Sequence, residues 1–85
     1  MTPSALRDRL LSFLAGRLPG QELNDSTPLL TSGLLDSLAL IDLTAWMEEE
    51  VGAAIDLDAI DNVAAEWNTV RDIVNFVAAR YDKVA

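Results

Sequence analysis

The first apolar positions of the chain recur with the spacing of an α-helix. Thr2 is a good helix N-cap, Pro3 fits a first helical turn, and Pro19-Gly20 would end the element. The apolar residues between these signals are Leu6, Leu10, Phe13, Leu14 and Leu18. This pattern predicts a helix that begins after Thr2 and ends before Pro19.

The end of the chain carries a second helical pattern. Thr69-Val70-Arg71-Asp72 resembles a capping box in which Asp takes the place of Glu, so a helix should begin at Thr69. Its apolar face follows the i, i+3, i+4, i+7, i+11 series and comprises Val70, Ile73, Val74, Val77 and Tyr81. Upstream, Ile60 and Val63 would hold a short helix around residues 57–65.

The middle of the chain divides into a loop and a helix. Residues 21–35 are rich in turn formers, and four leucines should pin this loop to the core: Leu29, Leu30, Leu34 and Leu35. A helix should then begin at Asp36-Ser37 and run to about Val51, with Gly52 as its stop. The fold class expected is all-α: a small four-helix bundle of three longer helices and one short third helix, in a single domain over residues 1–85.

The helix predicted after Asp36 has two apolar faces. One suits a core and comprises Leu40, Leu43, Met47 and Val51. The other lies on roughly the opposite side, with Leu38, Ile41 and Ala45 interleaved with Asp42, Glu48 and Glu49. An apolar stripe beside carboxylates predicts a docking surface for a partner with a basic patch. The alternative is that the short helix, or Trp46 and Trp67, covers part of the stripe, above all Leu38.

Charge narrows the classes of partner. The net charge of −8 is concentrated in residues 21–70, which hold eleven acidic residues and no Lys or Arg. Such an electric field repels phosphate backbones and anionic lipids, so nucleic acids and membranes are poor partners. A DNA-binding helix-turn-helix is disfavoured for the same reason. No apolar run is long enough to cross a bilayer. The first apolar stretch is interrupted by arginines, which does not fit the apolar segment of a signal peptide. We expect a cytoplasmic monomer.

The residues needed for common catalytic chemistry are missing. The chain has no Cys and no His, which removes thiolate ligands, the commonest general base and a Ser-His-Asp set. Asp56, Asp58 and Asp61 do not form a calcium loop, because Asp61 stands where such a loop needs Gly. The run Glu48-Glu49-Glu50 diverges around the helix axis and suits a solvated, partner-facing surface. We therefore predict neither catalytic residues nor a metal site.

Ser37 is the candidate for modification, because free amides and the helix dipole at a first helical turn favour phosphate. Alone it would be read as an ordinary helix-start residue. Its surroundings resemble the acyl and peptidyl carrier protein family, through Leu34-Leu35-Asp36-Ser37-Leu38, the following Leu40, Ile41, Leu43, Met47, Glu48, Glu49 and Val51-Gly52, and the later Ile55, Asp56, Ile60 and Thr69-Val70-Arg71-Asp72-Ile73.

The resemblance implies a cofactor and partners. It assigns Ser37 as the residue that receives 4′-phosphopantetheine from coenzyme A, with Asp36 as the adjacent motif acid, and residues 38–51 as the recognition helix. A phosphopantetheinyl transferase would add the arm. An adenylating ligase or acyltransferase would load cargo as a thioester, and a downstream transferase or condensing enzyme would take it. A chain without cysteine fits, because the thiol then has to arrive on the arm.

The subtype is less specific. Leu34-Leu35-Asp36-Ser37 and Glu66-Trp67-Asn68-Thr69 look most like stand-alone D-alanyl and other aminoacyl carriers, although glyceryl-type carriers share a similar junction. Fatty-acid carriers usually have Gly two residues before the Asp-Ser-Leu motif, whereas Leu34 stands at that position here. The interpretation is a non-catalytic acyl or aminoacyl carrier of natural-product, aminoacyl-transfer or lipid-type biosynthesis. The competing interpretation is an unmodified helical protein-interaction module.

Overall fold

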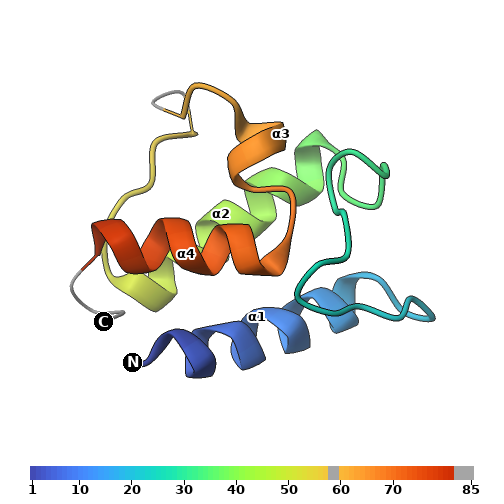
Figure 1. The fold of residues 1–85 in the computed structure, drawn as a ribbon, viewed down its shortest axis with the longest axis horizontal. Coiled ribbons are helices and arrows are strands. Elements are labelled where there is room, and N and C mark those ends of the chain that lie inside the picture. The colour runs from blue at the N-terminus through green and yellow to red at the C-terminus, as the bar shows by residue number, and fades with distance from the viewer. Residues whose placement is uncertain (58–59, 82–85) are drawn as a thin grey trace.

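Four helices make up the architecture of the computed structural model, which describes residues 1–57 and 60–81. In chain order they are α1 (Pro3–Arg17), α2 (Ser37–Val51), α3 (Val63–Glu66) and α4 (Val70–Arg80). In Figure 1, α1 runs below α4, α2 passes behind α4 so that its last turn is seen below it on the side of α1, and α3 lies beside the first turns of α2. The described residues contain no strand, so the predicted all-α bundle with one short third helix is confirmed.

The caps that the sequence predicted define two of the helices. Thr2 Oγ1 accepts a hydrogen bond from the Ala5 amide at 3.1 Å, and Pro3 occupies the first turn of α1. At α4, Thr69 Oγ1 accepts from the Asp72 amide at 3.0 Å and Asp72 Oδ2 accepts from the Thr69 amide at 3.2 Å. The capping box with Asp in place of Glu is therefore confirmed.

The short helix α3 begins later in the chain than predicted and contains fewer residues. It begins at Val63, after Asn62, whose Oδ1 accepts a hydrogen bond from the Ala65 amide at 3.2 Å. An N-cap has non-helical backbone, so a helix capped by Asn62 does not extend upstream to Leu57. Ile60 is buried and Val63 packs at the core edge, as predicted, while residues 58–59 of the predicted range lie outside the described residues.

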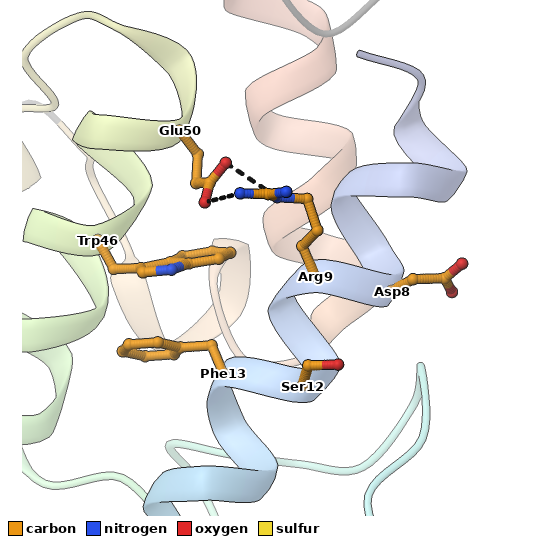
Figure 2. A pocket seen from close by; sticks show the side chains of 6 residues that line it. All are labelled: Asp8, Arg9, Ser12, Phe13, Trp46 and Glu50. Atoms are coloured by element: carbon orange, nitrogen blue, oxygen red, sulfur yellow. Dashed lines mark hydrogen bonds and ion pairs between the residues drawn. The ribbon is translucent and has the colours of Figure 1, made fainter.

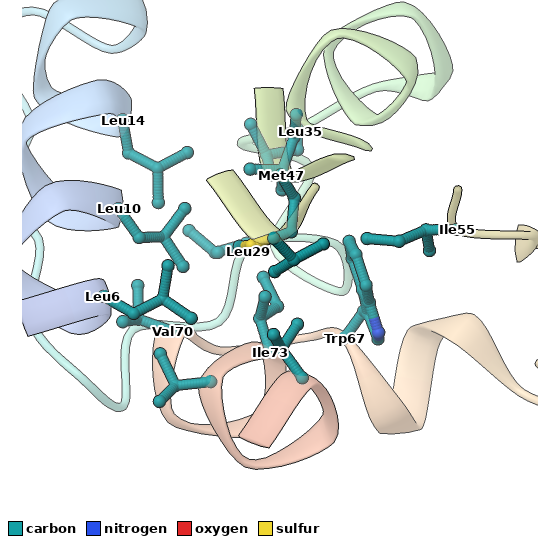
Figure 3. Close-up of a cluster of buried hydrophobic side chains, with 14 of the residues drawn as sticks. Leu6, Leu10, Leu14, Leu29, Leu35, Met47, Ile55, Trp67, Val70 and Ile73 are labelled. Carbon is teal, nitrogen blue, oxygen red and sulfur yellow. The ribbon is translucent and has the colours of Figure 1, made fainter. Parts of the chain in front are cut away.

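The core is built from one face of each long helix (Figure 3). Its buried members from helices are Leu6, Leu10 and Leu14 of α1, Leu43, Met47 and Val51 of α2, and Val70, Ile73, Val74 and Val77 of α4. Leu40, predicted for the core face of α2, is half-buried, and Thr44 is buried in addition to the predicted residues. Thr44 Oγ1 donates to the Leu40 carbonyl at 2.8 Å, which satisfies its hydroxyl inside the protein.

Trp67 is the largest fully buried side chain of this core. Its side chain is 0% exposed, and its Nε1 has no hydrogen-bond acceptor among the described residues. An unsatisfied buried donor costs about 1–3 kcal/mol. Trp67 therefore stabilises the core through the volume of its indole, not through its polar atom. Trp46 and Phe76, by contrast, are half-buried at the core edge.

Candidate functional site

Ser37 is the first residue of α2 and is exposed to solvent. The helix begins there because Asp36 has extended backbone and its Oδ1 accepts a hydrogen bond from the Ala39 amide at 2.8 Å. No described residue hydrogen-bonds the Ser37 hydroxyl. The side chain that the sequence singled out is thus an accessible hydroxyl without an internal partner.

The backbone around Ser37 favours an anion. The amides of Ser37 and Leu38 belong to the first turn, where no helical carbonyl precedes them, and no described residue accepts a bond from them. These amides and the positive end of the helix dipole stabilise negative charge on a group attached to the Ser37 oxygen. A phosphodiester at Ser37 therefore fits the residues present. The described residues form no cluster that could hold a metal ion.

A locally ordered turn delivers Asp36 and Ser37 to this position. Ser32 Oγ donates to the Pro28 carbonyl at 2.5 Å, the Leu35 amide donates to the Leu29 carbonyl at 2.9 Å, and Gly33 adopts a φ of 80°. Only a residue without a Cβ takes that φ without strain. Leu29 and Leu35 are buried in the core and Leu30 packs against it, so these three leucines hold the loop onto the core, whereas Leu34 is half-buried outside that cluster.

Asn68 is a positioning residue that the sequence analysis missed. Its Oδ1 accepts bonds from the Leu30 amide at 2.9 Å and the Thr31 amide at 3.0 Å, and its carbonyl accepts from the Leu29 amide at 2.7 Å. The junction between α3 and α4 thereby fixes the loop that precedes Ser37. An Asn just before a helix is usually read as a turn former, and nothing in the local pattern indicated a partner 38 residues away.

The predicted apolar stripe on α2 is uncovered. Leu38 is 75% exposed and Ile41 60% exposed, and Ala45 is also exposed. Neither Trp shields them, because Trp67 lies in the core and Trp46 stacks on Phe13 of α1 with ring centroids 4.8 Å apart. These three residues, called the α2 stripe below, form an apolar strip that begins beside Ser37.

The acidic residues of α2 have different surroundings. Asp42 forms an ion pair with Arg17 of α1 at 2.7 Å, and Glu48 is half-buried and accepts a hydrogen bond from the Ile55 amide at 2.7 Å. Glu49 is exposed, and no described residue pairs with it. Of these carboxylates, Glu49 is the one that the described structure leaves open to a partner.

Glu50 departs from the predicted solvated run, because its side chain is 13% exposed and paired with Arg9. Two hydrogen bonds, of 3.0 and 2.6 Å, join the guanidinium to the carboxylate (Figure 2). These hydrogen bonds and the charge of Glu50 raise the pKa of Arg9 above its ordinary value. The pair sits over Trp46, which in turn stacks on Phe13, so long side chains tie α1 to α2.

Two surface grooves flank α2. The one between α1 and α2 has a volume of about 460 Å³ and is lined by Phe13, Trp46 and the Arg9–Glu50 pair, among others. Trp46 lies about 14 Å along the helix from Ser37, so this groove is remote from the hydroxyl. The other, called the α2 groove below, has a volume of about 250 Å³ and lies between Ile41, Thr44 and Ala45 of α2 and Ile55 and Leu57 of the following segment.

Comparison with protein families identifies the class of protein to which this chain belongs. The model of the family described as the phosphopantetheine attachment site matches residues 5–77. The chain belongs to this family. It is a carrier protein of the phosphopantetheine-binding type, and the cofactor is covalently bound 4′-phosphopantetheine. Carriers of this type are generally non-catalytic and work with enzymes that modify and load them.

One further comparison and one property of the helices bear on this carrier. No match was found among the curated proteins, so none of them indicates its cargo. Among the helices formed by the described residues, none has the length and apolar character needed to cross a membrane.

Proposed function

We propose that Ser37 is the residue that carries the phosphopantetheine arm. The observation that carries this proposal is an exposed, unpartnered hydroxyl at the first turn of a helix whose amides are free to hold phosphate. In the transfer, the Ser37 oxygen attacks the pantetheine-bearing phosphorus of coenzyme A and loses its proton to a base of the transferase. The phosphoanhydride bond breaks, and the adenosine bisphosphate leaves.

The other serines within residues 5–77 are poorer candidates. Ser26 Oγ donates to Asn24 Oδ1 at 3.1 Å, and Ser32 Oγ donates to the Pro28 carbonyl at 2.5 Å, so both hydroxyls serve local turns. Ser12 lies within α1, where backbone amides bond to carbonyls of the preceding turn and cannot hold a phosphate. Ser37 alone of the four combines a free hydroxyl with a helix N-terminus in the described structure.

The full proposal is that residues 1–85 form one carrier domain, which presents an acyl or aminoacyl thioester to partner enzymes. Resemblance to the D-alanyl and aminoacyl carriers at residues 34–37 and 66–69 favours amino acids as cargo. Docking would use the α2 stripe together with Glu49, whose charge attracts a basic patch. That the carrier is a cytoplasmic monomer stays a prediction.

Intact mass tests the assignment. The purified chain is incubated with coenzyme A and a broad-specificity phosphopantetheinyl transferase, in parallel with Ser37→Ala and the matched control Ser12→Ala, which removes an exposed hydroxyl of α1. We expect the wild type and Ser12→Ala to gain the mass of one arm and Ser37→Ala to gain none. If the wild type gains no mass, the unmodified interaction module becomes the better description. A gain that persists in Ser37→Ala places the arm elsewhere.

A further inference from the structure

Two hollows on the surface share one wall. The first is the α2 groove, and the second, called the α4 hollow, has a volume of about 320 Å³ and is lined by Ile60 together with Phe76 and Tyr81 of the α4 end of the chain. Ile55 and Asp56 line both. The α2 groove and the α4 hollow are therefore opposite sides of the segment that follows α2.

Trp67 occupies the interior behind this wall. In Figure 3 the Ile55 side chain points toward the indole of Trp67. Phe76, which lines the α4 hollow, meets the same indole edge to face, with ring centroids 5.6 Å apart. The indole has an exposed fraction of 0%, and it packs behind Ile55, which lines both hollows, and against Phe76, which lines the α4 hollow.

The α2 groove starts in line with Ser37. Ile41 and Thr44 follow Ser37 at i+4 and i+7, positions that lie above one another on a single face of a helix. They lie about 6 and about 10 Å along the axis from Ser37. The groove is therefore within reach of a group tethered to the Ser37 oxygen, and Trp67 lies behind Ile55 in the wall of this groove.

We propose that Trp67 determines the cargo class of this carrier by filling the interior beside the α2 groove. Long acyl chains then find no interior space, and the carrier holds short polar acyl or aminoacyl groups at its surface. This inference rests on the proposed function, since it requires cargo tethered to Ser37. It adds a specificity-determining residue that lies outside the attachment motif and the docking face.

Removing the Trp67 indole should allow a long acyl chain to enter the interior. A smaller apolar residue at position 67 leaves an apolar cavity that joins the α2 groove to the α4 hollow, because Ile55 and Phe76 lose the ring that separates them. Dry apolar cavities of this kind bind apolar molecules. A straight acyl chain on the arm would enter the cavity, lose contact with water and stabilise the fold.

The experiment compares proteins that carry an acetyl, hexanoyl or decanoyl group on the arm. The phosphopantetheinyl transferase adds each acyl-phosphopantetheine arm from the corresponding acyl-coenzyme A. Thioester cleavage by hydroxylamine is followed by intact mass, and the midpoint of thermal unfolding by circular dichroism. We expect wild-type thioesters to be cleaved at rates that do not depend on chain length, with no rise in the unfolding midpoint. In Trp67→Leu, the decanoyl thioester should be cleaved several-fold more slowly than the acetyl thioester and raise the midpoint.

Trp46→Leu is the matched control, because it removes an indole that packs against α1, away from both hollows. It should behave like the wild type at every chain length. Slower cleavage of longer thioesters in the wild type would overturn the inference, and this result is decisive even if Trp67→Leu fails to fold. A folded Trp67→Leu without chain-length dependence would overturn it as well. Failure of the proposed function is distinguishable, because then no acyl-pantetheine mass is added at all.

Discussion

The Glu48 carboxylate accepts a hydrogen bond from the Ile55 backbone amide across 2.7 Å and thereby fastens the segment after α2 to the helix itself. Glu48 belongs to the acidic run that the sequence assigned to a partner surface. In the folded chain it is half-buried and holds in place the residue that forms one wall of the α2 groove. Neighbouring carboxylates of one run therefore have separable roles.

Glu48→Ala and Glu49→Ala should differ in stability although they remove the same charge. Loss of the charged acceptor leaves the Ile55 amide without its partner, so Glu48→Ala should lower the free energy of unfolding by about 1.5–3 kcal/mol. Glu49→Ala should leave it within about 0.5 kcal/mol of the wild type. Urea unfolding followed by circular dichroism measures both. Equal losses in the two variants would contradict the separate roles.

Asp36→Ala and Thr69→Ala both remove the N-cap of a helix, yet only the first lies beside Ser37, the proposed attachment residue. Each should cost about 1 kcal/mol of stability. Asp36→Ala should in addition slow the transferase, because the first turn that presents Ser37 frays when the Ala39 amide loses its acceptor. The measurement is the rate of mass gain at a temperature where both variants are folded. Equal rates for the two would limit Asp36 to a general capping role.

Ile41→Ser and Glu49→Lys should weaken partner docking without unfolding the bundle. Ile41 is 60% exposed, so its replacement removes contact area from the α2 stripe but little from the core. Glu49→Lys places a like charge opposite a basic patch. We expect a raised KM for the carrier in loading by its own ligase, with the unfolding midpoint unchanged.

Asp8→Lys is the control for this test, because it makes the same charge reversal on α1, where Asp8 points away from α2 (Figure 2). Its KM should match that of the wild type. A KM that changes as much in Asp8→Lys as in Glu49→Lys would show that net charge, not the α2 surface, governs docking.

Gly52→Ala and Gly16→Ala should change stability in opposite directions. Gly52 caps α2 with a φ of 69°, a left-handed conformation that costs a residue with a Cβ about 1–2 kcal/mol. Gly16 lies in α1 with nothing within 4 Å of an added Cβ, so alanine there should stabilise the helix by about 0.5–1 kcal/mol. Thermal and urea unfolding of both variants check the signs, and two changes of the same sign would contradict this reading of the backbone.

The helix ends were predictable from sequence because caps are local. Thr2, Asp36 and Thr69 each accept a bond from an amide three residues ahead, so the signal and its partner stand in one short stretch of chain. The short helix was misplaced because its cap, Asn62, lies inside the range whose apolar residues suggested a longer element. Ile60 is buried in the core although it lies before the first residue of α3, so its burial does not require a helix.

The sequence by itself determined the family, the three longer helices, and Ser37 as the candidate attachment residue, since these rest on local motifs and helical periodicity. Only the tertiary structure decided which carboxylates are already engaged, that Asn68 holds the loop before Ser37, and that Trp67 is fully buried in the core. Those facts depend on contacts between residues far apart in the chain, such as Arg17 with Asp42 or Asn68 with Leu30. No local pattern encodes such contacts, because packing alone brings their partners together.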